Sequence, residues 1–222
     1  MVFSIRKLAA AALVAAAVSA DSVSVDFEDF SISNTNGCGT ATTGFSDNLH
    51  GITITDNNVD ATILNNQKTA SCNTARTPDV ATALFNHTNP SPNNVLLVAV
   101  SLHAQVAQSG PVGVFYALNN DFSLDVTPVF TAAERNADNV AFAIVLHQDD
   151  FGPEIPEKAF RFTTADDGFG PFRVSASTNG QQYAFTDVVV SVEHGDPAKG
   201  QSRQTAFFVD NIQAEREVLV NA

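Results

Sequence analysis

The sequence predicts an all-β protein, a two-sheet antiparallel β-sandwich of the jelly-roll type. Short runs rich in β-branched and aromatic residues recur along the chain, and clusters of Asn, Asp, Gly, Pro and Ser separate them. After the first twenty residues no long stretch follows the 3.6-residue period of a helix. About twelve such runs occur, at the spacing that is typical of sandwiches and barrels.

The first run, 22–28, alternates apolar and polar residues, which predicts a half-buried strand. The further strands are expected at 51–55, 59–64, 80–85, 94–103, 112–118, 122–130, 139–147, 158–164, 172–178, 183–194 and 205–215. The runs 94–103 and 139–147 are apolar on both faces, so we expect them near the centre of their sheets. Only 131–139 has the composition of a short helical turn.

The first twenty residues have the composition of a secretory signal. Arg6 and Lys7 precede an apolar run, which ends at a small-x-small sequence, 18–20, of the kind that signal peptidase cleaves. The run is shorter than the roughly 20 apolar residues that cross a bilayer. We therefore expect a signal peptide over 1–20, a single β-sandwich domain over 21–222, and an extracellular protein without membrane insertion. A buried N-terminal helix is the alternative.

The chain is strongly acidic, with 24 Asp and Glu residues against 11 Lys and Arg residues and a net charge of −13. Such a surface repels nucleic acid and anionic lipid, because both normally bind to a basic patch. Cations, neutral sugars and basic partners remain compatible with it. Solubility alone is the simpler explanation of the charge.

The two cysteines, Cys38 and Cys72, lie in polar, turn-rich segments. In an oxidising compartment such a pair is expected to form a disulfide. This bond would join two long loops, 31–50 and 65–79, and would stabilise the fold by roughly 3–4 kcal/mol in the chain-entropy model. A metal site or a catalytic thiol is the less favoured interpretation.

An acidic residue interrupts the apolar strand that closes the chain, within "AFFVDNIQ". Strict alternation would place Asp210 on the same side as Phe208 and Ile212, where a carboxylate is costly to bury without a cation or several donors. The first strand carries "VDFEDF", so Glu28 would meet Asp210 if the first and last strands are neighbours. Two carboxylates with nearby carbonyl oxygens suit Ca²⁺, which takes about six to eight oxygen ligands.

These two motifs resemble those of secreted jelly-roll modules, a group that includes carbohydrate-binding modules. Phe27-Glu28 matches the Phe-Glu of the family's first strand, and Val-Asp-Asn-Ile at 209–212 matches its last strand. The resemblance implies a structural calcium ion held by Glu28 and Asp210. It also implies that the partner is carbohydrate or a cell-surface glycan.

The aromatic content departs from that family. Many sugar-binding modules stack Trp or Tyr on the sugar ring, whereas this chain has no Trp, two Tyr and 17 Phe. Phenylalanines on strands are expected to fill the core. We therefore expect binding through polar groups and no flat aromatic platform.

Three histidines, His103, His147 and His194, each stand at the end of an apolar strand. If these ends converged, the imidazoles would suit a metal ion or acid–base catalysis. The alternative is that they lie at separate edges of the sandwich.

Catalysis on the same fold would require paired groups. Glu193 lies within a strand-like run, and Asp125, Asp187 or His194 are its candidate partners for hydrolysis or elimination. The nucleophile motif G-x-S-x-G is absent from the sequence.

Two acidic loop segments, 147–154 and 164–172, share an Asp-Asp followed by Phe-Gly-Pro. Their residue types favour turns, and a second cation or ligand contact is the alternative. Asn86 begins an Asn-His-Thr sequon and is the candidate N-glycosylation site.

The sequence thus predicts a secreted, non-catalytic binding protein with carbohydrate as its leading ligand class. A polysaccharide-active hydrolase or lyase, and a structural or adhesive coat protein, are the alternatives.

Overall fold

The computed structural model describes part of the chain. The described residues are 19–28, 40–42, 48–49, 52–55, 61–65, 79, 83, 94–106, 114–148, 158–177, 187–195 and 202–220. Cys38, Cys72 and Asn86 lie outside these ranges, as do residues 1–18, so the disulfide, the glycosylation site and the signal peptide remain predictions. In the described ranges, no helix is long and apolar enough to cross a membrane.

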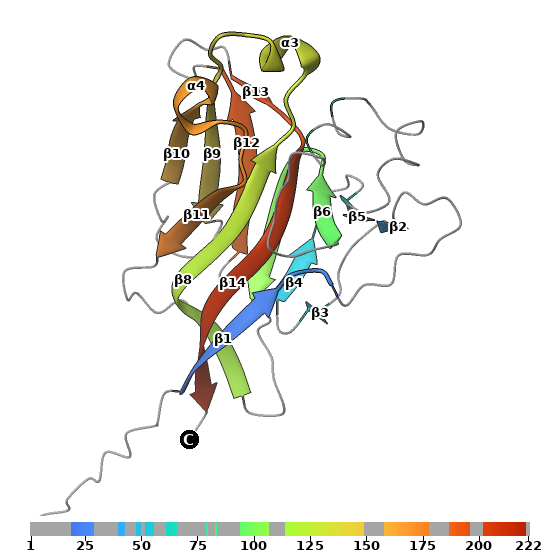
Figure 1. The fold of residues 1–222 in the computed structure, drawn as a ribbon. Helices are drawn as coiled ribbons and strands as arrows, with labels where there is room; N and C mark the ends of the chain where they lie inside the picture. Colours follow the sequence, from blue (N-terminus) through green and yellow to red (C-terminus); the bar gives the residue numbers. More distant parts are fainter. Residues whose placement is uncertain are drawn as a thin grey trace, which may run out of the picture.

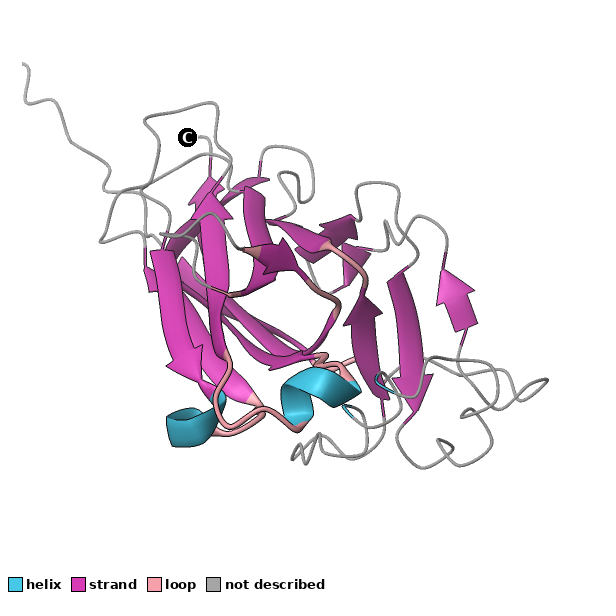
Figure 2. Ribbon diagram, turned by 90° about the horizontal axis from the view of Figure 1, so that it is seen from above, coloured by secondary structure: helices cyan, strands magenta, loops and turns pink. Residues whose placement is uncertain are grey.

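The described strands form two antiparallel sheets that face each other (Figure 1 and Figure 2). Sheet A contains, in order, β11 (Phe172–Ser177), β8 (Val114–Pro128), β14 (Phe207–Val220), β6 (Asn94–Val98), β5 (Ala61–Asn65) and β2 (Thr40–Thr42), with β1 (Ser19–Val25) paired to β14. Sheet B contains β10 (Lys158–Thr163), β9 (Ala141–Gln148), β12 (Asp187–His194), β7 (Ser101–Val106), β4 (Ile52–Thr55) and β3 (Asn48–Leu49), with β13 (Arg203–Gln204) paired to β12. The predicted two-sheet antiparallel sandwich is confirmed.

The main core lies between the sheets, because alternate side chains of each strand point inward. Its fully buried members include Leu96, Leu124, Ile144, Val190 and Val209. A second cluster covers the other face of sheet A and contains Leu64, Ala83, Val95, Val129 and Phe208. Strands β5, β6 and β14 are therefore buried on both faces, which explains why β6 reads as a continuous apolar run.

The predicted strand 94–103 is two strands in different sheets. The chain bends at Ala99 and Val100, so β6 belongs to sheet A and β7 to sheet B. Apolar composition continues across the bend because both strands contribute side chains to the core. Sequence periodicity therefore does not reveal the corner.

The predicted strands 112–118 and 122–130 are one strand, β8. The polar segment between them resembles a turn, but pairing with β14 extends along both parts of β8 and holds it as a single element. The predicted strand 80–85 is wrong at Ala83, which is helical. Three very short strands, β2, β3 and β13, were not predicted.

The predicted helical turn is α3 (Ala132–Arg135), and its start is fixed by a capping box. Thr131 Oγ1 accepts the backbone N–H of Glu134, while the Glu134 carboxylate accepts the backbone N–H of Thr131 at 2.7 Å. Arg135 donates to the Asp79 carboxylate at 2.9 Å, which ties this turn to Asp79.

A β-bulge at Asp210 and Asn211 changes the alternation of β14. The register with β8 shifts between Asp210 and Gln213, and Asn211 has a left-handed φ of 47°. Val209 and Ile212 therefore both point into the main core. The prediction that Asp210 shares a side with Ile212 is wrong for this reason.

Two strands lie end to end along one edge of β14. Residues Phe207–Val209 pair with β6, and from Ile212 onward the strand pairs with β1, while β8 occupies the opposite edge. Asp210 and Asn211 fall between the two pairings, where β1 ends and β6 begins (Figure 1). A polar pair is tolerated here because the ladder on that edge is interrupted.

We predict that Asn211→Leu destabilises the protein by about 2 kcal/mol, because leucine adds left-handed strain and loses a hydrogen bond to Asp125. Asn211→Gly loses the same bond but relieves the backbone strain, so its cost should be smaller. Urea unfolding of both variants measures the difference. Equal costs for Leu and Gly would show that the backbone conformation at Asn211 is not what selects asparagine.

Candidate functional site

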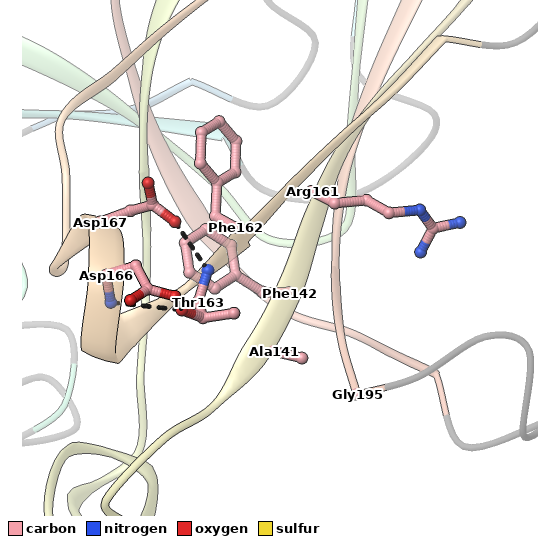
Figure 3. A pocket seen from close by; sticks show the side chains of 8 residues that line it. All are labelled: Ala141, Phe142, Arg161, Phe162, Thr163, Asp166, Asp167 and Gly195. Atoms are coloured by element: carbon pink, nitrogen blue, oxygen red, sulfur yellow. Dashed lines mark hydrogen bonds between the residues drawn. The ribbon is translucent and has the colours of Figure 1, made fainter.

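A pocket of about 530 Å³ opens where β9, β10 and β12 meet at one end of sheet B (Figure 3). It is lined by Ala141, Phe142, Arg161, Phe162, Thr163, Asp166, Asp167 and Gly195. The Gly195 N–H donates to the Ala141 carbonyl at 2.8 Å and so joins the end of β12 to β9 at the rim. Aromatic rings beside polar and charged groups are the composition of a small-ligand site.

The aromatic side of this pocket is held in place by packing. Phe142 and Phe162 lie opposite each other on β9 and β10, and their rings stack with centroids 5.4 Å apart. The ring of Phe172, which belongs to sheet A, packs on the ring of Phe162 with centroids 4.5 Å apart. The rings are therefore anchored between the sheets, with Phe142 itself almost fully buried.

Asp166 and Asp167 form the turn that their sequence predicts. They belong to α4 (Thr164–Asp167), which is capped by Thr163 and followed by Gly168 with φ 78°. Asp166 Oδ2 accepts the Thr163 hydroxyl at 2.8 Å, and Asp167 Oδ2 accepts the Thr163 N–H at 2.9 Å. Both carboxylates thus stabilise the turn.

The outer face of sheet B carries a row of side chains next to the pocket. Arg161 lies opposite Ala143, Ala143 opposite Glu193, and Glu193 opposite Gln204. We call these four residues the Arg161–Glu193 row. Because strands lie about 4.8 Å apart, the Cα atoms of Arg161 and Glu193 are about 10 Å apart. Among the described residues, neither side chain has a hydrogen bond or an ion pair.

The three strand-end histidines do not converge. His103 and His147 occupy the positions on either side of Val189, on the two strands that flank β12. His194 lies five residues further along β12 and points into the core, so it is on the opposite face. The three histidines therefore do not form one cluster, and the alternative of separate edges does not describe His103 and His147, which flank the same position of β12.

His194 is part of a buried polar network. Its ring is 3% exposed and stacks on Phe130 with centroids 4.6 Å apart. His194 Nδ1 lies 2.9 Å from Glu134 Oε1, which also accepts from Arg203 at 2.7 Å. In the described part of the chain, His194 Nε2 has no hydrogen-bond partner. The network joins α3, β12 and β13.

The charges in this network follow from burial and hydrogen bonding. Burial alone would raise the pKa of Glu134, but hydrogen bonds from His194, Thr131 and Arg203 outweigh it and lower the pKa to about 2. Burial lowers the pKa of His194, against the opposing effect of Glu134. His194 is therefore neutral at pH 7, and its Nδ1–H donates to the Glu134 carboxylate. This arrangement is structural and holds the corner behind the pocket.

The end of β1 brings Glu28 to the β14 bulge. Phe27 is buried with a left-handed φ of 61°, and its carbonyl accepts the Asn94 side chain at 3.0 Å. Glu28 Oε1 accepts the backbone N–H of Asn94 at 3.0 Å. Asp210 lies in β14 with 0% exposure, and its Oδ1 accepts the Asn211 N–H at 2.7 Å.

Several nearby carboxylates affect the pKa of Asp210. The pKa of Asp210 is raised to about 7, chiefly by burial; the hydrogen bond from the Asn211 N–H opposes this rise, and the charges of Asp125, Asp26 and Glu28 contribute to it. Glu28 and Asp210 are therefore close enough to interact electrostatically. Their oxygen atoms are the ligand type that Ca²⁺ prefers.

The sequence reasoning missed Arg161, Phe162 and Glu134. In "FRFTT" the alternation of a strand already places Arg161 on the face opposite Phe162, so the sequence indicates that Arg161 points away from the core. Glu134 contacts His194 and Arg203, which lie about 60–70 positions away in the sequence, so a local pattern could not reveal its role. The one local indication is Thr131, three residues earlier, which forms a capping box with Glu134.

No protein-family model matches the chain, and no curated protein sequence matches it. Among the solved structures that align with it is the C-terminal family 22 carbohydrate-binding module of Clostridium thermocellum Xyn10B, with 18% identity, a TM-score of 0.32, and coverage of 82% of this chain and 94% of that one. The CBM22-1 xylan-binding domain of Paenibacillus barcinonensis Xyn10C aligns with 10% identity and a TM-score of 0.32, over 83% and 98% of the two chains. The family 11 module of Clostridium thermocellum, in complex with a β-1,3-1,4-mixed-linked tetrasaccharide, aligns with 12% identity and a TM-score of 0.25, over 55% and 75%. At these values the alignments assign neither a family nor a ligand.

We predict that Asp210 makes the metal-free protein less stable as the pH rises. Its folded pKa of about 7 lies above the ordinary value of 3.8, so the stabilisation from the bound proton is complete below about pH 4 and is lost as the pH rises through 7. Denaturant unfolding in EDTA between pH 4 and pH 8 gives the free energy of unfolding of wild type and of Asp210→Asn. The stability of the variant relative to wild type should increase by a few kcal/mol as the pH rises. A constant difference between the two proteins would show that Asp210 titrates normally.

Proposed function

We propose that this protein is a secreted, non-catalytic carbohydrate-binding β-sandwich whose ligand lies on the Arg161–Glu193 row and reaches into the adjoining pocket. One observation carries the proposal: a guanidinium, a carboxylate and an amide stand on one rigid row, beside a pocket that the partly exposed ring of Phe162 lines. Sugars present hydroxyl groups and apolar C–H faces, which hydrogen-bonding side chains and aromatic rings respectively can bind.

The positions around Glu193 favour binding over hydrolysis. Glycoside hydrolysis uses two carboxyl groups about 5–9.5 Å apart across the scissile bond. On the described strands, the residues opposite Glu193 are Ala143 and Gln204. Asp125 belongs to the other sheet and His194 to the other face of β12, so neither shares a groove with Glu193.

The proposal includes a structural calcium ion at Glu28 and Asp210. The observation that supports it is a buried carboxylate in the last strand with further carboxylates acting on it. In the described part of the chain, no three His, Cys, Asp or Glu side chains form a complete metal site, so backbone carbonyls or water would supply the other ligands. A bound ion would neutralise Asp210 and tie the end of β1 to β14.

We expect EDTA to lower the melting temperature of the wild-type protein by several degrees, because a ligand that binds only the folded state stabilises it. Asp210→Ala should melt at a lower temperature and should hardly respond to EDTA. Differential scanning calorimetry with EDTA, and after calcium is restored, measures both effects. If chelation leaves the wild-type melt unchanged, the calcium site is wrong.

Carbohydrate binding is tested by an oligosaccharide array followed by calorimetry on the best ligand. Glu193→Gln should weaken binding about tenfold, since a charged hydrogen bond contributes about 1.5 kcal/mol or more. Glu215→Gln is the matched control, because it makes the same charge change on an exposed position of sheet A. Equal effects of the two variants, or new reducing ends released from the ligand, would contradict the proposal.

A further inference from the structure

Arg161 differs from the other arginines whose side chains the structure describes. Arg135 pairs with Asp79, Arg173 with Asp125, and Arg203 with Glu134, at 2.9, 3.2 and 2.7 Å. Arg161 has no such partner among the described residues, although the chain carries 24 acidic residues against 11 basic ones. A guanidinium left unpaired at a pocket in so acidic a protein is available to an anionic group of a ligand.

The side chains around Arg161 leave its guanidinium exposed. Its neighbours on the outer face of sheet B are Ala159 and Thr163 on β10, Ala143 directly opposite, and Ala141 and Val145 diagonally opposite. These side chains are too short to cover the guanidinium. Figure 3 shows the Arg161 side chain extending away from Asp166 and Asp167, with Phe162 between them. Those two carboxylates instead accept hydrogen bonds from Thr163.

We infer that the site takes a carbohydrate that carries a carboxylate, such as a uronic acid residue, and that Arg161 binds this carboxylate. The inference rests on the proposed function and specifies its ligand class. A guanidinium offers two parallel N–H donors that match the two oxygen atoms of a carboxylate. The binding mode is therefore a planar, two-point contact at one end of the Arg161–Glu193 row.

Glu193 fixes the direction in which such a ligand lies. The row places its Cα about 10 Å from that of Arg161, and Ala143 between them is 3% exposed, so a ligand there contacts the two long charged side chains and not the strand beneath them. The Glu193 carboxylate accepts hydrogen bonds from hydroxyl groups and repels a carboxylate. The acidic group of the sugar therefore lies at Arg161 and its hydroxyl groups lie toward Glu193.

The charge of the whole protein limits how acidic the ligand is. A net charge of −13, with Glu193, Asp166 and Asp167 close to the site, repels a densely charged polyanion. One cationic residue neutralises one carboxylate. The ligand class is therefore an otherwise neutral polysaccharide with isolated uronic acid residues.

The test compares two probes, a neutral oligosaccharide that bears one uronic acid residue and the same compound with that carboxyl group reduced to an alcohol. Calorimetry should show the wild-type protein binding the acidic form about tenfold more tightly or better. Arg161→Gln should remove this preference, and Arg161→Lys should keep only part of it because lysine lacks the two-point geometry. Arg161 is exposed and on an edge strand, so both variants are expected to fold.

Lys158→Gln is the matched control. Lys158 lies on the same strand and carries the same charge, but its amine donates to the Ser175 carbonyl at 2.7 Å. This variant should keep the preference for the acidic form. If it loses as much preference as Arg161→Gln, net charge and not a contact is responsible, and the inference is wrong.

The outcomes separate the inference from the proposed function. Equal affinity of the wild-type protein for the acidic and the reduced probe overturns the inference and leaves carbohydrate binding intact. If neither form binds, and no oligosaccharide on the array binds, both fail.

Discussion

The buried carboxylate of Asp210 is the constraint around which sheet A is arranged. β14 is the central strand, with β8 along one edge and β6 and β1 end to end along the other. Asp210 and Asn211 occupy the junction of those two strands. Alternation after Val209 points Asp210 away from the main core, and the bulge that follows lets Ile212 enter that core as Val209 does. The cost of burying the charge is reflected in the pKa of about 7. A cation shared with Glu28 would remove that cost and would hold the start and the end of the sandwich together.

The proposed binding surface lies on the other sheet, so stability and recognition depend on separate residues. The Arg161–Glu193 row projects from sheet B, whose inner face packs on the core through Phe142, Ile144 and Val190. Behind the pocket, the contact of His194 with Glu134 secures the end of β12. A rigid sheet gives fixed spacing between recognition groups, which reduces the entropy lost when a ligand binds. Polar side chains on such a surface can change ligand specificity without disturbing the fold.

The sequence predicted the features that depend on local pattern and composition. Alternation and turn residues gave the sandwich, and the two terminal motifs drew attention to Glu28 and Asp210. Alternation could not reveal the bulge at Asn211, because an inserted residue is seen only against its partner strand. The corner at Ala99 and Val100 was hidden by apolar residues that serve both sheets. Arg161 is left uncovered because the side chains around it on β10 and β9 are short, and only the register between these two strands shows which residues those are.

The most direct test of the role assigned to Asp210 is its own titration, followed by carbon-13 NMR of the side-chain carboxyl group in metal-free protein and then with added calcium. The account predicts a pKa near 7 without metal, and a carboxylate that stays ionised to much lower pH once calcium is bound. A pKa close to 3.8 in metal-free protein, or a titration that calcium does not move, would contradict the account.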